Sequence, residues 1–323
     1  MRVLVTGAAG MIGRKLTERL LAEGHVGGRP IAALHLHDVV APEVSSPLVT
    51  AMTGDLADPA ETERLVATRP DLVVHLGAVV SGEAERDMAK GYRVNLDGTR
   101  ALFEGLFRAG LHPRVVFAST GAVFGGPFPE VIEDDFAPRP QTSYGTQKLM
   151  GEALLDDLSR RDLLDGVSIR FPTICVRPGK PNAAASGFFS GIIREPLAGL
   201  PAVLPVPRDV VHTMASPRSA VGFVLHAATM DTAPMGSRRA VTMPGVAVSV
   251  AEEIEALRRV AGDRAVDLIE ERPDPAVWAI VRTWAPRYDP RRARELGFTA
   301  EASFDEIVRA HVEDELGGQV PAL

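Results

Sequence analysis

Hydrophobic residues in the first half of the chain follow two periods in turn, one typical of strands and one typical of helices. Short apolar runs rich in β-branched residues predict strands. Several runs are apolar at nearly every position, as expected where both faces of a parallel sheet are covered. The predicted strands are Arg2–Thr6, Ile31–His37, Leu48–Thr53, Leu72–Leu76, Arg114–Ser119 and Val167–Phe171.

Amphipathic stretches with helical spacing lie between these strands. They cover Ile12–Ala22, Pro59–Thr68, Glu83–Ala109 and Thr142–Arg160. Repeated strand–helix units of this kind predict an α/β fold with a Rossmann-type, doubly wound parallel sheet. We expect this first domain to span residues 1–175.

The pattern changes after the sixth predicted strand, where residues 177–204 are rich in Pro, Gly, Ala and Asn. Residues 208–230 predict a loop that runs into a helix, and further helices are expected at Val250–Ala261 and Ser303–Glu315. We expect residues 176–323 to form mainly a smaller α+β domain, with some later segments returning to the first domain.

Composition narrows the class of protein. The chain has 323 residues, and 35 basic against 42 acidic residues give a net charge of −7, with no Lys/Arg cluster. This argues against nucleic acid or an anionic membrane as a partner. Cys175 is the only cysteine, which excludes an intrachain disulfide and a multi-cysteine metal site. Without a signal-peptide pattern or a long apolar run, we expect a soluble, cytoplasmic protein that binds no metal.

The segment TGAAGMIG lies directly between the first predicted strand and the first predicted helix. Gly7 allows a tight turn, Gly10 lets the backbone approach a pyrophosphate, and Gly13 lets the helix pack on the strand. Met11 and Ile12 begin the helix, whose free N–H groups face the diphosphate. A glycine-rich turn without a ligand is the alternative, and the strand–loop–helix context favours dinucleotide binding.

Asp38 follows the second predicted strand. A carboxylate at this position accepts hydrogen bonds from the adenosine ribose and repels a 2′-phosphate, which favours NAD over NADP. The alternative is a solvated aspartate in a turn. Arg14, just after the third glycine, keeps NADP open as a second possibility.

Tyr144 and Lys148 are four residues apart on a predicted helix and therefore share one face. A phenol with a pKa near 10 is a poor base at neutral pH, but a nearby ammonium group and an oxidised nicotinamide stabilise the phenolate. The spacing alone also fits a solvated helix face. Ser119 or Thr120 would stand at the carboxyl end of the fifth strand, where such sheets bind ligands.

Together these motifs resemble the extended branch of the short-chain dehydrogenase/reductase superfamily, the NAD-dependent epimerase/dehydratase family. The resemblance covers nearly the whole chain. Besides the glycine loop, it rests on residues 54–56 (GDL), 76–78 (LGA), 94–99 (VNLDGT), 119–125 (STGAVFG), 144–148 (YGTQK), 208–212 (RDVVH) and 289–298.

The resemblance implies roles around the cofactor. It implies that Asp55 and Leu56 hold the adenine, that Leu76, Gly77 and Ala78 lie near the cofactor, and that Asn95 supports the central helix.

It also implies roles at the reacting centre. Tyr144 is the acid/base, and Lys148 binds the nicotinamide ribose and tunes Tyr144. Thr120 aligns with the catalytic hydroxyl, with Ser119 as the alternative. The family's usual homodimer would use the two predicted helices at residues 83–109 and 142–160.

Two departures from the family pattern bear on the substrate. Dehydratases of this branch carry an acidic residue beside the catalytic hydroxyl, whereas Gly121 and Ala122 follow here. The run from Arg170 to Leu197 lacks the usual sugar-nucleotide-binding start. It closely resembles dehydrogenases of four-carbon sugar acids, which oxidise the 2-hydroxyl of D-erythronate to 2-dehydro-D-erythronate with NAD.

A small hydroxy acid needs an anchor for its carboxylate, and arginine is the preferred partner. Arg177 is the first candidate and Arg218 the second, with a surface ion pair as the alternative for each. Asn182 and Ser186 are candidates for binding the other hydroxyls, or they cap loops instead. His212 is interpreted as a packing or supporting residue.

The sequence thus predicts an NAD-dependent dehydrogenase in which residues 1–175 bind the dinucleotide and residues 176–323 mainly bind a sugar acid. Tyr144, with Ser119 or Thr120, would hold the 2-hydroxyl and take its proton. The first alternative is a sugar-nucleotide epimerase that uses the same residues. The second is a non-catalytic, NAD(P)-binding regulator.

Overall fold

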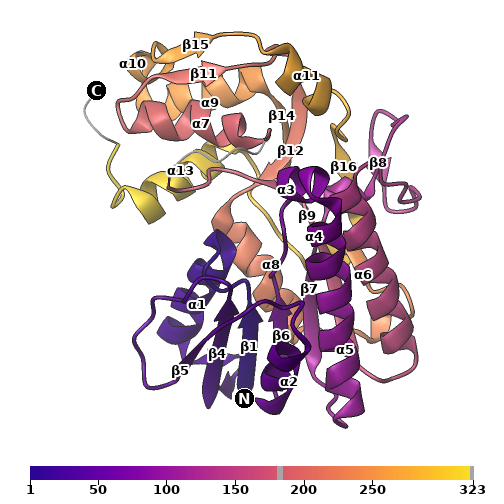
Figure 1. The fold of residues 1–323 in the computed structure, drawn as a ribbon. Helices are drawn as coiled ribbons and strands as arrows, with labels where there is room; N and C mark the ends of the chain where they lie inside the picture. The colour runs from indigo at the N-terminus through magenta and orange to yellow at the C-terminus, as the bar shows by residue number, and fades with distance from the viewer. Residues whose placement is uncertain (180–184, 321–323) are drawn as a thin grey trace.

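The computed structural model describes residues 1–179 and 185–320. Its main sheet has seven strands in the order β13-β9-β7-β6-β1-β4-β5, and all neighbouring pairs are parallel (Figure 1). Strand order reverses between β1 and β6, as in a doubly wound, Rossmann-type sheet. The predicted fold class is therefore confirmed. The strands are β1 (Arg2–Thr6), β4 (Ala33–Asp38), β5 (Val49–Thr53), β6 (Leu72–His75), β7 (Arg114–Thr120), β9 (Asp165–Phe171) and β13 (Ala240–Thr242).

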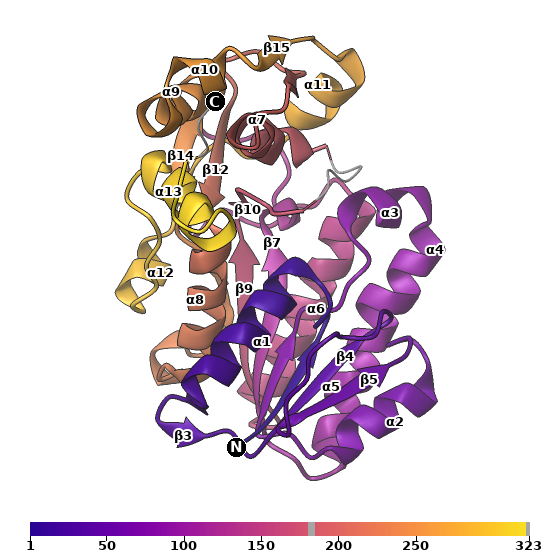
Figure 2. The same cartoon turned by 90° about the vertical axis from the view of Figure 1, so that its left-hand side faces the viewer.

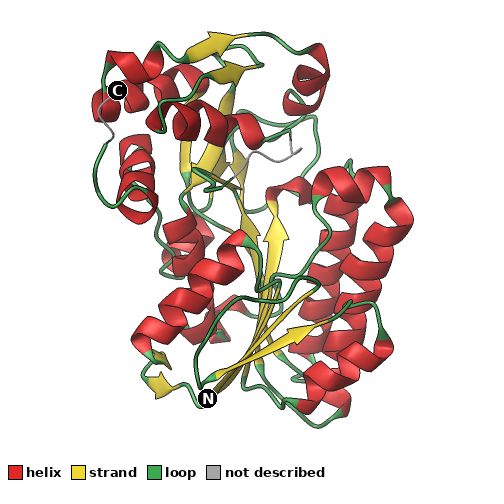
Figure 3. Cartoon of the chain, turned by 60° about the vertical axis from the view of Figure 1, so that its left-hand side comes forward, coloured by secondary structure: helices red, strands yellow, loops and turns green. Residues whose placement is uncertain are grey.

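Two layers of helices cover the main sheet because its strands are apolar on both faces. Val3 and Val5 of β1 join the core beneath α1 (Met11–Glu23) and α8 (Pro217–Thr229). Leu4 points the other way, into the core beneath the second layer. Figures 2 and 3 show the sheet between these layers. The second layer consists of α2 (Pro59–Ala67), α5 (Thr99–Arg108) and α6 (Ser143–Arg160).

The helix predicted over Glu83–Ala109 is interrupted. The prediction of one continuous helix was therefore wrong. The segment consists of α3 (Ser81–Arg86), α4 (Met88–Gly91), the π-helix η1 (Tyr92–Gly98) and α5. Asp87 leaves the helical conformation, and its side chain accepts a hydrogen bond from the Lys90 N–H at 3.0 Å. Asp87 thus caps the start of a new helix, α4. Hydrophobic periodicity alone does not reveal this interruption.

In the second half of the chain, β13 belongs to the main sheet and α8 packs against it, whereas most of the other elements form smaller sheets and helices above the main sheet in Figure 1. The helix α9 (Val250–Ala261) matches its prediction, and α13 (Phe304–Glu315) begins just after its cap, Ser303. The segment 208–230 contains α8 and also a strand that was not predicted, β12 (Val211–Ala215). The other elements are β10 (Thr173–Ile174), α7 (Gly187–Leu197), β11 (Ala202–Leu204), β12 (Val211–Ala215), β14 (Val246–Ser249), α10 (Asp263–Val266), β15 (Ile269–Glu271), α11 (Pro275–Val281) and α12 (Arg291–Glu295).

Short elements complete the described residues: β2 (His25–Val26), β3 (Arg29–Pro30), β8 (Ile132–Glu133), β16 (Tyr288–Asp289) and the 3-10 turns η2 (Gly121–Val123) and η3 (Ala233–Met235). None of the helices in the described part of the chain is both long and apolar enough to span a membrane.

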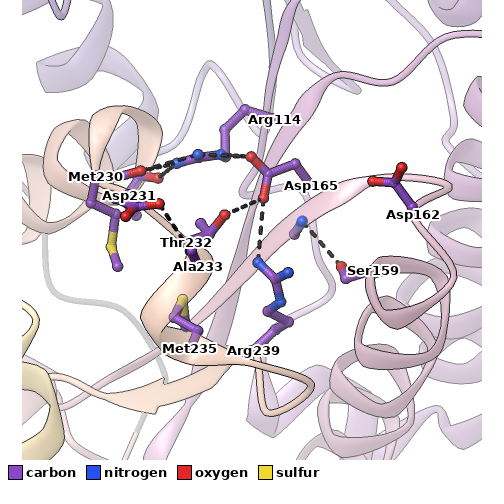
Figure 4. A network of polar contacts seen from close by, with 12 residues as sticks. Arg114, Ser159, Asp162, Asp165, Met230, Asp231, Thr232, Ala233, Met235 and Arg239 are labelled. Atoms are coloured by element: carbon purple, nitrogen blue, oxygen red, sulfur yellow. Dashed lines mark hydrogen bonds and ion pairs between the residues drawn. The ribbon is translucent and has the colours of Figure 1, made fainter.

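A polar network joins the segment after α8 to the amino end of the sheet (Figure 4). The Asp165 carboxylate accepts hydrogen bonds from Arg114 at 2.8 Å, from Thr232 at 2.7 Å and from Arg239 at 3.3 Å. Arg114 also donates to the carbonyls of Ala227 and Met230. These contacts hold α8 against the main sheet and fasten the segment that leads into β13, its edge strand.

Candidate active site

The glycine loop between β1 and α1 is packed so closely that it excludes side chains. Gly7 has φ +72°, and a Cβ there would lie 2.7 Å from the Gly77 nitrogen. A Cβ on Gly13 would collide with the Gly7 carbonyl oxygen. The loop thus presents bare backbone just before Met11, the first residue of α1. This cradle at a helix N-terminus fits a dinucleotide diphosphate.

Asp38 and the glycine loop lie together, as the sequence predicts. Asp38 ends β4, and its Oδ2 accepts a hydrogen bond from the Ala9 N–H at 2.9 Å. The carboxylate therefore stands beside the loop, where it favours a free ribose over a 2′-phosphate. Arg14 is exposed on α1.

The turns after β5 and β6 adjoin the glycine loop. Leu56 is buried, and its Cδ1 would lie 2.7 Å from a Cβ placed on Gly77. Asp55 accepts hydrogen bonds from the Ala57 N–H at 2.9 Å and from Arg93 at 2.7 Å. The turn that contains Leu76, Gly77 and Ala78 thus lies between the glycine loop and Leu56.

A buried chain of hydrogen bonds supports this region, and the sequence analysis missed it. Thr6 Oγ1 lies 2.7 Å from His75 Nδ1, and His75 Nε2 lies 2.9 Å from Thr99 Oγ1. Thr99 donates in turn to the Asn95 carbonyl. Burial lowers the pKa of His75 to about 3, so the ring is neutral and both nitrogens are satisfied. This chain joins β1, β6 and the π-helix into a rigid base for the loop.

Asn95 connects that base to the helix that carries Tyr144. Its side chain exchanges hydrogen bonds with the Val79 backbone at 2.7 and 2.9 Å and donates to Gln147 Oε1 at 2.8 Å. Gln147 lies between Tyr144 and Lys148 on α6. The sequence analysis did not select Gln147, because its importance depends on a partner 52 residues away.

Tyr144 and Lys148 occupy the first turns of α6, whose N-cap is Thr142. The Lys148 ammonium donates to the Ala118 carbonyl at 2.9 Å and lies 5.8 Å from the centre of the Tyr144 ring. Burial raises the pKa of Tyr144 to about 12, and Arg177 opposes this. Burial lowers the pKa of Lys148 to about 8, and Glu152 opposes this. Burial therefore favours the neutral form of both groups.

Ser119 and Thr120, adjacent on β7, are in different surroundings. Phe117 and Ser119 share the face of β7 that packs toward α6, because side chains alternate along a strand. Ser119 is only 3% exposed and donates its hydroxyl hydrogen to Glu152 on α6. Thr120 is partly exposed, and its oxygen accepts from the Ala122 N–H at 3.1 Å. These contacts favour Thr120 as the hydroxyl available to a substrate.

Arg177 and Ser186 lie together. The Arg177 guanidinium donates to the Ile174 carbonyl at 3.0 Å and to Ser186 Oγ at 3.1 Å. Its charge also lowers the pKa of the Tyr144 phenol, against the larger effect of burial. Asn182 lies outside the described residues.

Arg218 is paired elsewhere, and its side chain is 49% exposed. It binds Glu313 at 2.9 Å and Asp314 at 2.6 Å on the surface. This environment matches the ion-pair alternative, so the structure favours Arg177 as the carboxylate anchor.

His212 stands among aromatic and polar groups of the second half of the chain. Its Nε2 lies 2.7 Å from Thr173 Oγ1, and its ring stacks on Phe189 with centres 5.1 Å apart. Burial lowers the pKa of His212 to about 4, so the ring is neutral. Among residues 1–179 and 185–320, no cluster of His, Cys, Asp and Glu is suited to hold a metal ion.

Comparison with known proteins agrees with this geometry. The model of the NAD dependent epimerase/dehydratase family matches residues 3–213. The chain belongs to this family. The matched residues include both the glycine loop and the Tyr144–Lys148 pair.

Two curated members of the family match nearly the full length. D-erythronate dehydrogenase from Cupriavidus necator is 48% identical over 97% of this chain and 98% of its own length. D-erythronate dehydrogenase from Haemophilus influenzae is 37% identical over 98% of this chain and 100% of its own. A solved structure described as the nucleoside-diphosphate-sugar epimerase from Agrobacterium tumefaciens is 55% identical, has a TM-score of 0.97, and covers 99% of this chain and 96% of that one.

Proposed function

We propose that this protein is an NAD-dependent dehydrogenase that oxidises the 2-hydroxyl of D-erythronate to 2-dehydro-D-erythronate. The observation that carries the proposal is the 48% identity to a D-erythronate dehydrogenase over 97% of the chain. At such identity over the full length, the substrate-binding half is shared as well as the dinucleotide-binding half.

Arg177 is the proposed anchor of the substrate carboxylate. In the described part of the chain, the groups that accept hydrogen bonds from its side chain are both neutral, a carbonyl and a hydroxyl. Burial lowers the pKa of Arg177, because desolvation disfavours the charged guanidinium. An anionic ligand would compensate it, and a carboxylate matches the guanidinium in shape.

The proton of the 2-hydroxyl is taken by Tyr144. Thr120 and Tyr144 hold this hydroxyl, and the Lys148 ammonium stabilises the Tyr144 phenolate. The phenolate becomes a phenol when it takes the substrate proton, and it must release that proton to solvent before the next turnover. NAD, when bound, supplies the hydride acceptor and a positive ring that also favours the phenolate. Arg177 keeps the substrate oriented while its 2-hydroxyl is oxidised.

The reaction is tested by following NADH formation with D-erythronate, L-threonate, D-threonate, glycerate and UDP-glucose. We expect the highest kcat/KM with D-erythronate. No NADH with any of the four acids would refute the proposal.

The role of Tyr144 is tested with Tyr144→Phe, which removes only the phenolic oxygen. We expect turnover to fall at least about 1,000-fold, because the base is lost, while NADH binding measured by fluorescence stays within about twofold. Near-normal turnover would remove Tyr144 from the mechanism.

A sugar-nucleotide epimerase is the second candidate, favoured by the description of the 55% identical Agrobacterium structure. An epimerase returns the hydride to the same substrate, so NAD would stay bound to the purified protein and no net NADH would form. Conversion of a UDP-sugar without NADH release would select this candidate.

We also propose a homodimer formed through the layer of α4, η1, α5 and α6. Met88 on α4 and Met150 on α6 are 59% and 43% exposed on this layer. Large apolar side chains at such positions are more stable when covered by a partner.

A further inference from the structure

Three ionisable groups lie on one stripe of α6. Tyr144, Lys148 and Glu152 are spaced four residues apart, so each is one turn from the next. Glu152 is only 2% exposed, as is Lys148. A carboxylate buried beside the lysine of a catalytic pair is well placed to influence it, yet it contacts neither substrate nor cofactor in the proposed mechanism.

Glu152 is held by the two strands beneath α6. Its Oε1 accepts a hydrogen bond from Ser119 of β7, and both its oxygens accept from Arg170 of β9, at 2.6 to 3.1 Å. Lys148 binds Ala118, the residue next to Ser119. The Glu152 carboxylate and the Lys148 ammonium thus both come from α6, and both contact adjacent residues of β7.

The other charged groups near Lys148 do not replace Glu152. Burial, together with the charge of Lys148, lowers the pKa of His75 of β6 to about 3, so His75 carries no charge at neutral pH. Arg170 is cationic, and Asp156 lies a further turn along α6, where it accepts a hydrogen bond from the Arg239 backbone N–H. Glu152 is the group whose charge opposes the effect of burial on Lys148.

We propose that Glu152 is a positioning residue, which keeps Lys148 in its charged form beside Tyr144 and holds the Ser119 hydroxyl away from the reacting centre. This inference rests on the proposed function only in assuming that Tyr144 is the base. After the pair has lost one proton, two forms compete, phenolate with ammonium and phenol with neutral amine. Only the first form takes a proton from the substrate. The buried carboxylate favours it, because it stabilises the ammonium one turn away.

Carbon-13 NMR of the lysine ε-carbons tests this on the protein without cofactor or substrate. The chain has four lysines, Lys15, Lys90, Lys148 and Lys180, and Lys148→Met identifies the resonance of interest by its absence. In Glu152→Gln we expect the midpoint of the Lys148 titration to fall by about one pH unit or more. Asp156→Asn, the same exchange one turn further away, should leave this midpoint within about 0.3 pH units. An unchanged midpoint in Glu152→Gln would overturn the inference.

A double variant separates charge from packing. Glu152→Gln leaves Arg170 buried without its partner, which lowers stability, whereas Glu152→Gln with Arg170→Met removes both charges and should restore much of it. We expect most of the lowering of the Lys148 midpoint to persist in the double variant. Recovery of both Tm and the midpoint to wild-type values would assign the effect to packing and overturn the inference.

Kinetics provide the second measurement. With D-erythronate, Glu152→Gln should lower the plateau of the kcat profile about tenfold and move its acidic limb to lower pH, with KM for NAD unchanged within about twofold. An unchanged profile would count against the inference. If the wild-type protein does not oxidise D-erythronate but the Lys148 midpoint still falls in Glu152→Gln, the substrate proposal fails and the role of Glu152 stands.

Discussion

At the scale of the residue, burial shifts the pKa values of Tyr144 and Lys148 in opposite directions, and each shift favours the neutral form of the group. It raises the pKa of the phenol to about 12 and lowers that of the amine to about 8, so both groups are driven toward neutrality. The proposed mechanism needs both groups charged. Nearby charges must therefore oppose the effect of burial, and among the described residues Arg177 does so for Tyr144 and Glu152 for Lys148.

Lys148→Met should make the apoprotein more stable and the enzyme inactive. Because the folded-state pKa of Lys148 lies near 8, below its ordinary 10.5, the buried charge destabilises the fold below pH 8, and this cost disappears as pH approaches 10.5. We expect a higher Tm than wild type at pH 7, a smaller difference at pH 10, and a kcat at least about 100-fold lower. Thermal unfolding monitored by circular dichroism checks this. A lower Tm for the variant at every pH would contradict it.

Arg177→Lys should weaken binding of the sugar acid. A lysine ammonium cannot form the two parallel hydrogen bonds that a guanidinium makes with a carboxylate. We expect KM for D-erythronate to rise about 10- to 100-fold, with KM for NAD unchanged within about twofold. Arg218→Lys is the matched control, since that guanidinium is paired with Glu313 and Asp314 on the surface. Equal effects of the two substitutions would argue against the assignment.

At the scale of the element, helices and strands bring distant groups into contact. The helix α6 presents Tyr144 and Lys148 near the end of β7, and the Asn95–Gln147 bond fixes α6 against the π-helix. At the opposite end of the sheet, Asp165 fastens the segment after α8 to β7 and β9 (Figure 4). A change at either set of contacts is expected to move a whole element.

Asp165→Ala tests the second set of contacts. It removes the acceptor shared by Arg114, Thr232 and Arg239, all of them partly or fully buried. We expect the free energy of unfolding, measured with urea, to fall by about 2 to 3 kcal/mol. Asp135→Ala removes a carboxylate that is 97% exposed and should cost no more than about 0.5 kcal/mol. A loss no larger for Asp165→Ala than for Asp135→Ala would show that the network adds little.

At the scale of the whole molecule, two clusters of buried hydrophobic residues lie between the main sheet and its helical layers, and a third lies in the second half of the chain. In the layer of α4, η1, α5 and α6, the side chains of Met88 and Met150 are exposed. These features are the basis of the proposed homodimer, which would bury the two methionines without covering the carboxyl ends of the strands.

Met150→Glu should therefore yield a monomer. A charge in the middle of an apolar interface is costly to bury, whereas it is well solvated on a free surface. Light scattering after gel filtration should give the dimer mass for wild type and the monomer mass for the variant. Val203→Glu, at an apolar residue 39% exposed on β11, should remain dimeric. A monomeric wild-type protein would end the dimer proposal.

The amino-acid sequence by itself determined the local features: the first six strands of the main sheet, the helices of the first half apart from the breaks within residues 83–109, the glycine loop, and the Tyr144–Lys148 spacing. These depend on residues a few positions apart, so periodicity and turn chemistry reveal them. The tertiary structure decided the surroundings of Ser119, Thr120, Arg177 and Arg218, and it revealed the contacts of Glu152 and Gln147. Those outcomes depend on partners far away in the chain, such as Ser119 and Glu152, 33 residues apart, which only packing brings into contact.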